Sequence, residues 1–125
     1  MTRTEQLLQL RPILALSTEE ASAAEKFQNE TLRPILKFQN DLVVQFFKNY
    51  CVKRKSIFFK MDTKGQSNYI EKTLLKDQKL KQSLIGLIIG FFTVEEYNNY
   101  LNAESEYNRR ITRMLIKRLQ SNLIT

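Results

Sequence analysis

Glycine and proline are scarce in this chain, and their scarcity restricts the possible folds more than any other feature. Three glycines and two prolines occur in 125 residues. A β-sandwich or β-barrel needs many turns, and turns are rich in these two residue types. A few long helices with short connections need far fewer of them. We therefore expect an all-α fold, a compact bundle of four to five helices in which Pro34 kinks a long first helix.

Capping signals divide the chain into elements. Residues 93–96 (TVEE) have the pattern of a reciprocal capping box, as do residues 17–20 (STEE). Asp77 is a further candidate cap, and residues 62–65 (DTKG) are the strongest turn signal. The predicted helices cover residues 4–10, 18–52, 66–75, 78–91 and 94–123. We expect a short N-terminal helical arm over 1–16 and a single helical-bundle domain over 17–125.

Two glycines interrupt the most apolar of these predicted helices. Gly86 and Gly90 lie one turn apart, and each costs up to about 1 kcal/mol relative to alanine inside a helix. We expect a neighbouring backbone to pass close to them, and a ligand that needs a smooth wall is the functional alternative.

Histidine is absent from the chain, and Cys51 is the single cysteine. The chain therefore has no imidazole base near neutral pH, no Ser–His or Cys–His nucleophile and no histidine metal ligand. We expect no metal site and no cofactor, and we regard an enzyme as the weaker hypothesis. A lone cysteine cannot form an internal disulfide, which favours the cytoplasm. The longest apolar run falls short of the roughly eighteen residues of a membrane span.

Three polar residues fall on faces that the apolar pattern marks as buried. Glu104 and Asn108 lie within the apolar stripe of the helix predicted over 94–123. Gln39 lies within the apolar band of the long helix predicted over 18–52. An unpaired buried polar group costs about 1–3 kcal/mol, so we expect these side chains to meet in a buried polar layer. Such a layer could fix the register of the helices. It could also form a pocket in which Glu104 is a base or a ligand anchor. A third possibility is that the apolar stripe opens there to solvent or to a partner.

Basic residues exceed acidic residues by 20 to 13, which gives a net charge of +7. This excess favours attraction to nucleic acid, anionic lipid or an acidic protein. Solvated helix faces and complements to the helix dipole are the structural alternatives. The candidate basic patch comprises Lys53, Arg54, Lys55, Lys60 and Lys64 after the first long helix, and Arg109, Arg110, Arg113 and Lys117 along the last helix.

Residues 32–41 (LRPILKFQND), 69–100 and 108–111 (NRRI) resemble a family of small uncharacterised all-helical bacterial proteins, some of which carry the label "glyoxalase". The resemblance covers the chain from about residue 20 onward and implies that the core lies there. The glyoxalase label implies histidine and glutamate metal ligands. No residue of this chain matches those sets, so no catalytic residue is assigned.

These observations favour a non-catalytic interaction or regulatory module that binds an acidic macromolecular partner or itself, as a homodimer. A basic accessory protein for nucleic acid is the alternative. A small enzyme that uses a buried Glu104 is a third possibility.

Overall fold

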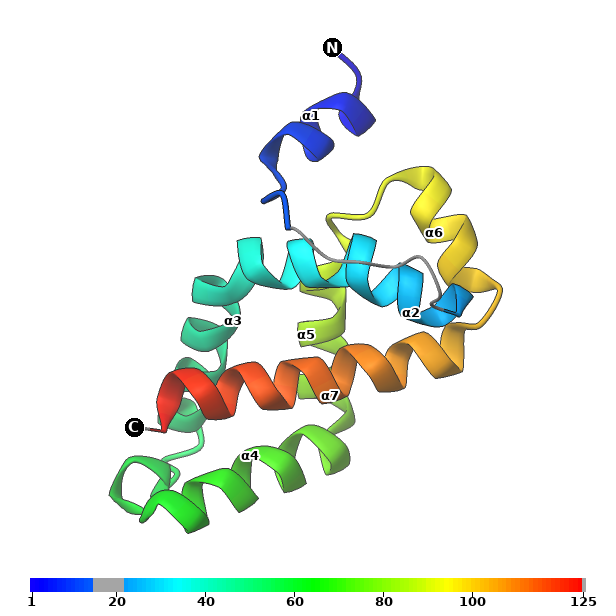
Figure 1. Ribbon diagram of the computed structural model, residues 1–125. Helices are drawn as coiled ribbons and strands as arrows, with labels where there is room; N and C mark the ends of the chain where they lie inside the picture. Colours follow the sequence, from blue (N-terminus) through cyan, green and yellow to red (C-terminus); the bar gives the residue numbers. More distant parts are fainter. Residues whose placement is uncertain (15–21, 125) are drawn as a thin grey trace.

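Helices account for the regular structure of the computed structural model, which describes residues 1–14 and 22–124 (Figure 1). No strand occurs in these two ranges, so the predicted all-α class is confirmed, and no helix in them is both long and apolar enough to cross a membrane. The elements are α1 (Arg3–Leu10), α2 (Ala23–Phe27), the π-helical turn η1 (Gln28–Leu32), α3 (Arg33–Lys53), the 3-10 turn η2 (Phe58–Lys60), α4 (Thr63–Lys76), α5 (Gln78–Ile89), α6 (Val94–Leu101) and α7 (Glu104–Leu123).

The helix predicted over 18–52 is found as an uninterrupted helical run over 23–53. Ser22 caps the run, because its hydroxyl accepts a 3.1 Å hydrogen bond from the Glu25 amide. The capping box predicted at 17–20 lies outside the described residues. The run consists of α2, η1 and α3. The wider turn η1 ends two residues before Pro34, which has no N–H to continue the α-helical ladder.

Side-chain caps begin the next three helices. Asp77 caps α5 as predicted, because its Oδ1 accepts from the Leu80 amide at 3.1 Å. The predicted capping box is present at the start of α6. The turn predicted at 62–65 is wrong, since Asp62 is the N-cap of α4 and accepts from the Gly65 amide at 2.7 Å. An aspartate can satisfy a nearby amide in either setting, which is why the pattern was ambiguous.

The single helix predicted over 94–123 is wrong, because the chain divides there into α6 and α7. Ala103 has φ −149° and ψ 51°, outside the helical region. The helical phase restarts at Glu104 after this change of direction. A stripe of residues extended through the break therefore does not share one face.

The core lies where α7 packs against α3, α4 and α5 (Figure 1). From α7, the side chains of Ile111, Leu115 and Leu119 are fully buried. Burying a side chain of this size contributes about 1.5–3 kcal/mol, so one face of α7 is firmly held. The same cluster includes Leu36, Val43 and Phe47 from α3, Ile70 and Leu74 from α4, and Leu84 and Ile88 from α5.

The N-terminal arm is attached by two arginines. Arg3 donates to the carbonyls of Gly90 and Phe92 at 3.0 and 2.8 Å, and Arg11 donates to the carbonyl of Phe91 at 2.6 Å. These carbonyls belong to residues between α5 and α6, outside the hydrogen-bond ladder of either helix, so the arginine side chains supply their partners. The boundary predicted between residues 16 and 17 lies outside the described residues.

Glu96 connects the arm to the body of the protein. Its carboxylate accepts two hydrogen bonds from Arg11, at 2.5 and 2.6 Å, one from the Thr31 hydroxyl at 3.0 Å and one from the Thr93 amide at 2.8 Å. The Arg11 side chain is only 7% exposed. Burial alone would raise the pKa of Glu96, but the hydrogen bonds outweigh it and hold this pKa below its ordinary value.

The E96Q substitution should lower the free energy of unfolding by about 2–4 kcal/mol, because the buried Arg11 guanidinium loses its counter-charge. Urea unfolding at neutral pH measures this loss, and E95Q at the exposed neighbouring position should cost less than about 0.5 kcal/mol. The folded-state pKa of Glu96 is lowered, so its contribution is complete above the unfolded pKa of about 4.3 and is lost as the pH falls through the folded pKa. Wild type and E96Q should therefore converge in acid. Equal stabilities of E96Q and E95Q at neutral pH would contradict this role.

Gly86 lies on an open side of α5. A Cβ built there meets no atom within 4 Å, so the close backbone approach predicted at this position is wrong. At Gly90 a Cβ would lie 3.3 Å from the Gly86 carbonyl oxygen, which is a tight contact. The two glycines, which look equivalent in sequence, therefore differ in the space around them.

The G86A substitution should raise the free energy of unfolding by about 0.5–1 kcal/mol, because alanine restricts the unfolded chain and fits the helix without a clash. The midpoint of urea unfolding measures the gain. G90A is the matched control and should gain less, since its methyl group presses on a carbonyl oxygen. A loss of stability in G86A would show that the space beside α5 is not open.

Candidate functional site

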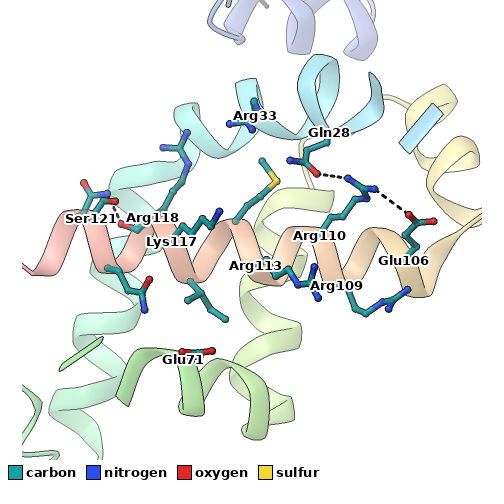
Figure 2. A pocket seen from close by; sticks show the side chains of 14 residues that line it. Gln28, Arg33, Glu71, Glu106, Arg109, Arg110, Arg113, Lys117, Arg118 and Ser121 are labelled. Atoms are coloured by element: carbon teal, nitrogen blue, oxygen red, sulfur yellow. Dashed lines mark hydrogen bonds and ion pairs between the residues drawn. The ribbon is translucent and has the colours of Figure 1, made fainter. Parts of the chain in front are cut away.

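A concave surface lies between α7 and the helical run over 23–53, with α4 at its rim (Figure 2). It has a volume of about 970 Å³. We call it the α7 groove. Its lining residues are Gln28, Arg33, Glu71, Glu106, Arg109, Arg110, Arg113, Met114, Ile116, Lys117, Arg118, Gln120, Ser121 and Asn122.

Arg109, Arg113 and Lys117 form a row along the exposed face of α7. They are four residues apart, so consecutive members are separated by about 6 Å along the helix axis. Ile111 and Leu115, on the other side of the helix, are fully buried. Within the described part of the chain, no carboxylate forms an ion pair with any member of the row. Among residues 1–14 and 22–124, the row therefore presents three positive charges with no ion-pair partner.

Neutral amide oxygens hold two more arginines in place. Arg110 donates to Oε1 of Gln28 at 2.8 Å, and Arg118 donates to Oδ1 of Asn40 at 3.2 Å. Figure 2 shows the first of these bonds crossing from α7 to the helical run. An amide oxygen orients a guanidinium without cancelling its charge. The Glu106 carboxylate, 3.3 Å from Arg110, offsets part of the charge at that end of the groove.

Like charges come together where α3 begins. Arg33 donates from Nε to Oδ1 of Asn29 at 2.8 Å, and so it is also oriented by an amide. Burial lowers the pKa of Arg118, and the positive charge of Arg33 lowers it further. The lining as a whole contains six arginine and lysine side chains and two glutamates. The groove therefore has a surplus of positive charge that attracts anions.

The structure brings together one half of the predicted basic patch and not the other. Four of its members line the groove, namely Arg109, Arg110, Arg113 and Lys117. The remaining members, Lys53, Arg54, Lys55, Lys60 and Lys64, do not line it.

Arg54 from the second half of the patch has a structural role. One guanidinium nitrogen lies 3.0 Å from Oδ2 of Asp77, and the guanidinium carbon lies 4.7 Å from the centre of the Tyr50 ring. The Tyr50 hydroxyl donates to the same carboxylate at 2.6 Å and is the main cause of the lowered pKa of Asp77. These contacts join the end of α3 to the cap of α5.

Sequence reasoning missed Arg33 and Arg118 as members of the site. Arg118 directly follows Lys117, and a rotation of about 100° per residue places it at the edge of the same helix face. That signal was present in the sequence. Arg33 belongs to another helix, and only the packing of α3 against α7 brings it to the groove.

The buried polar layer predicted from Gln39, Glu104 and Asn108 does not form. Glu104 is exposed in the first turn of α7, so the prediction is wrong at that position. Gln39 is buried, but it donates to the Leu87 carbonyl at 2.9 Å. Asn108 accepts from the Tyr100 hydroxyl at 2.5 Å. Glu104 shares a helix face with Asn108, but it is the first residue of α7 after the break at Ala103, and the buried residues of α7 begin only at Tyr107.

Residues 1–14 and 22–124 hold no cluster of three or more acidic, cysteine or histidine side chains that could bind a metal ion. Comparison of the chain with protein-family models, curated proteins and solved structures finds no match. The resemblance to the helical bacterial family stays a prediction. The geometry and charge of the α7 groove are therefore the basis for assigning a function.

The triple substitution R109Q/R113Q/K117Q, which we call the groove variant, should be more stable than wild type at low salt by about 0.5–1 kcal/mol. It removes two repulsive pairs one turn apart on a helix face. The difference should shrink as NaCl is added, because the screening length falls to about 10 Å at 0.1 M. Thermal unfolding across a salt series measures this change.

A matched control separates the groove from overall charge. K53Q/K60Q/K76Q, which we call the control variant, removes the same three charges from exposed positions outside the groove lining. It should gain less stability than the groove variant. Equal gains would attribute the effect to net charge and would contradict a local repulsion in the groove.

Proposed function

We propose that this protein is a non-catalytic helical interaction module that binds an acidic macromolecular partner in the α7 groove. The observation that carries the proposal is the row of Arg109, Arg113 and Lys117, which forms no ion pair with the other described residues. Repulsion within such a row is a cost in the free protein, and an anionic partner removes it on binding. Complementary charge also speeds encounter and selects against basic competitors.

The groove offers charge and hydrogen bonds, with little that could carry out a reaction. The Ser121 hydroxyl lines it, but the chain has no histidine to act as its base. The hypothesis of an enzyme built on a buried Glu104 loses its premise, since that side chain is exposed.

The helical frame supports binding by holding both walls of the groove. We infer that α3, α4, α5 and α7 form the bundle that the sequence predicts, and that η1 and Pro34 together kink the run over 23–53. Gln28 and Arg33 flank this kink and line the wall opposite α7. A rigid wall keeps its cations in place before the partner arrives, which lowers the entropy cost of binding.

We also infer that the protein works in the cytoplasm. Cys51 is fully buried in the core, and burial raises the pKa of its thiol to about 11. A thiol in this state is unreactive, and a lone reduced cysteine suits a reducing compartment. Self-association, the other partner predicted from sequence, stays a prediction, for which the exposed Phe38, Leu42 and Phe46 of α3 offer a surface.

Wild-type protein should bind heparin, a mixed polyanion, at least about tenfold more tightly than the groove variant. The reason is that three charge-assisted contacts are lost together. Elution from a heparin column and titration at fixed salt measure the difference, and light scattering of the same samples gives the oligomeric state. The control variant should behave like wild type. Identical elution of the two variants would place anion binding outside the groove and overturn the proposal.

A further inference from the structure

The lining of the α7 groove contains few groups that could anchor a protein partner. Its apolar side chains are Met114, which is half-buried, and Ile116, which is buried. Protein interfaces gain most of their affinity from apolar and aromatic anchors at the centre of the contact. The exposed aromatic side chains Phe38, Phe46, Phe59 and Tyr97 do not line the groove. An acidic protein would therefore find charge in the groove but no apolar centre.

The same observation bears on nucleic acid bases. Base recognition in single strands uses aromatic platforms on which the bases stack. With no aromatic side chain in its lining, the groove has no such platform. Any nucleic acid held there would be held by its backbone, and its bases would not be read.

The cations of the groove suit phosphate groups. Five of the six are arginines, and the planar guanidinium fork can donate two parallel hydrogen bonds to a phosphate. Hydroxyl and amide side chains are common partners of phosphate oxygens and sugars. Ser121 supplies an exposed hydroxyl at the end of the groove beyond Lys117.

The arrangement of the cations suits a polymer with a charge on every repeat. The row from Arg109 to Lys117 spans eight residues, or about 12 Å of α7. Arg33 and Arg118 come from the two opposite walls, as Figure 2 shows. A phosphate between these walls would bridge both and relieve their repulsion. A phosphodiester backbone can do this at one end of the groove while its neighbouring phosphates meet the row.

We propose that the acidic partner is a nucleic acid, held in the α7 groove through its phosphodiester backbone without reading of the bases. This inference rests on the proposed function and names the chemistry of the partner. Single strands and duplexes share this backbone, and direct comparison tells which of them the groove takes.

The test is fluorescence anisotropy with three labelled polymers: a mixed-sequence single strand, its duplex, and poly-glutamate of matched charge. One of the two nucleic acids should bind at least about tenfold more tightly than poly-glutamate. A change of base sequence should alter the affinity by less than about threefold, since backbone contacts carry no sequence information. Whichever of the single strand and the duplex binds more tightly is the form of nucleic acid that the groove takes.

Salt dependence locates the contacts. Each phosphate contact contributes a slope of about −0.7 to −0.9 to log K against log salt. The groove variant should therefore lose about two to three units of slope, and the control variant should lose less than one. R109K/R113K keeps the charge and should keep the slope, while binding several-fold more weakly because the guanidinium forks are lost.

The outcomes separate the two proposals. Equal affinity for poly-glutamate and nucleic acid, with the same loss in the groove variant, would overturn the nucleic-acid inference and leave the proposed function standing. A strong preference for one base sequence would also overturn the inference. Absence of binding to all three polymers, or equal losses in the groove and control variants, would overturn both. Far-ultraviolet circular dichroism checks that every variant is folded, which the exposure of the substituted side chains favours.

Discussion

The burial of one face of α7 determines the arrangement of the groove. Ile111, Leu115 and Leu119 are fixed against three other helices. Because the helix has 3.6 residues per turn, this contact also fixes the side of α7 from which each remaining side chain extends. Arg109 and Arg113 must face away from the core. The hydrophobic contact that stabilises the fold therefore also places the three charges of the row on one exposed face of α7.

The features that sequence reasoning found are those set by short-range chemistry. Asp77 caps α5 through the amide three residues on, and Thr93 and Glu96 satisfy each other's amides across the same interval. Both caps depend only on residues close in the sequence, so the sequence is enough to predict them. The row on α7 follows equally from helical periodicity. For these features the local pattern and the final structure agree.

The features that sequence reasoning missed depend on distant packing. Nothing local marks Ala103 as a break, since alanine is the strongest helix former. The rings of Tyr100 and Tyr107 are buried and lie 6.4 Å apart. In an unbroken helix, residues seven apart are separated by about 10.5 Å along the axis, so the break brings the two rings together. Arg33 illustrates the same limit, because its membership of the groove follows from the packing of two helices.

The positive charge of the α7 groove does not depend on pH in the physiological range. A guanidinium keeps its proton throughout the physiological range, and the chain has no histidine that could gain or lose one. Mild acidification therefore cannot open or close the groove by changing its own charge. Its occupancy would follow the mobile ions of the surrounding solution. Magnesium or polyamines that coat an anionic polymer would compete with Arg113 and its neighbours for the same phosphates.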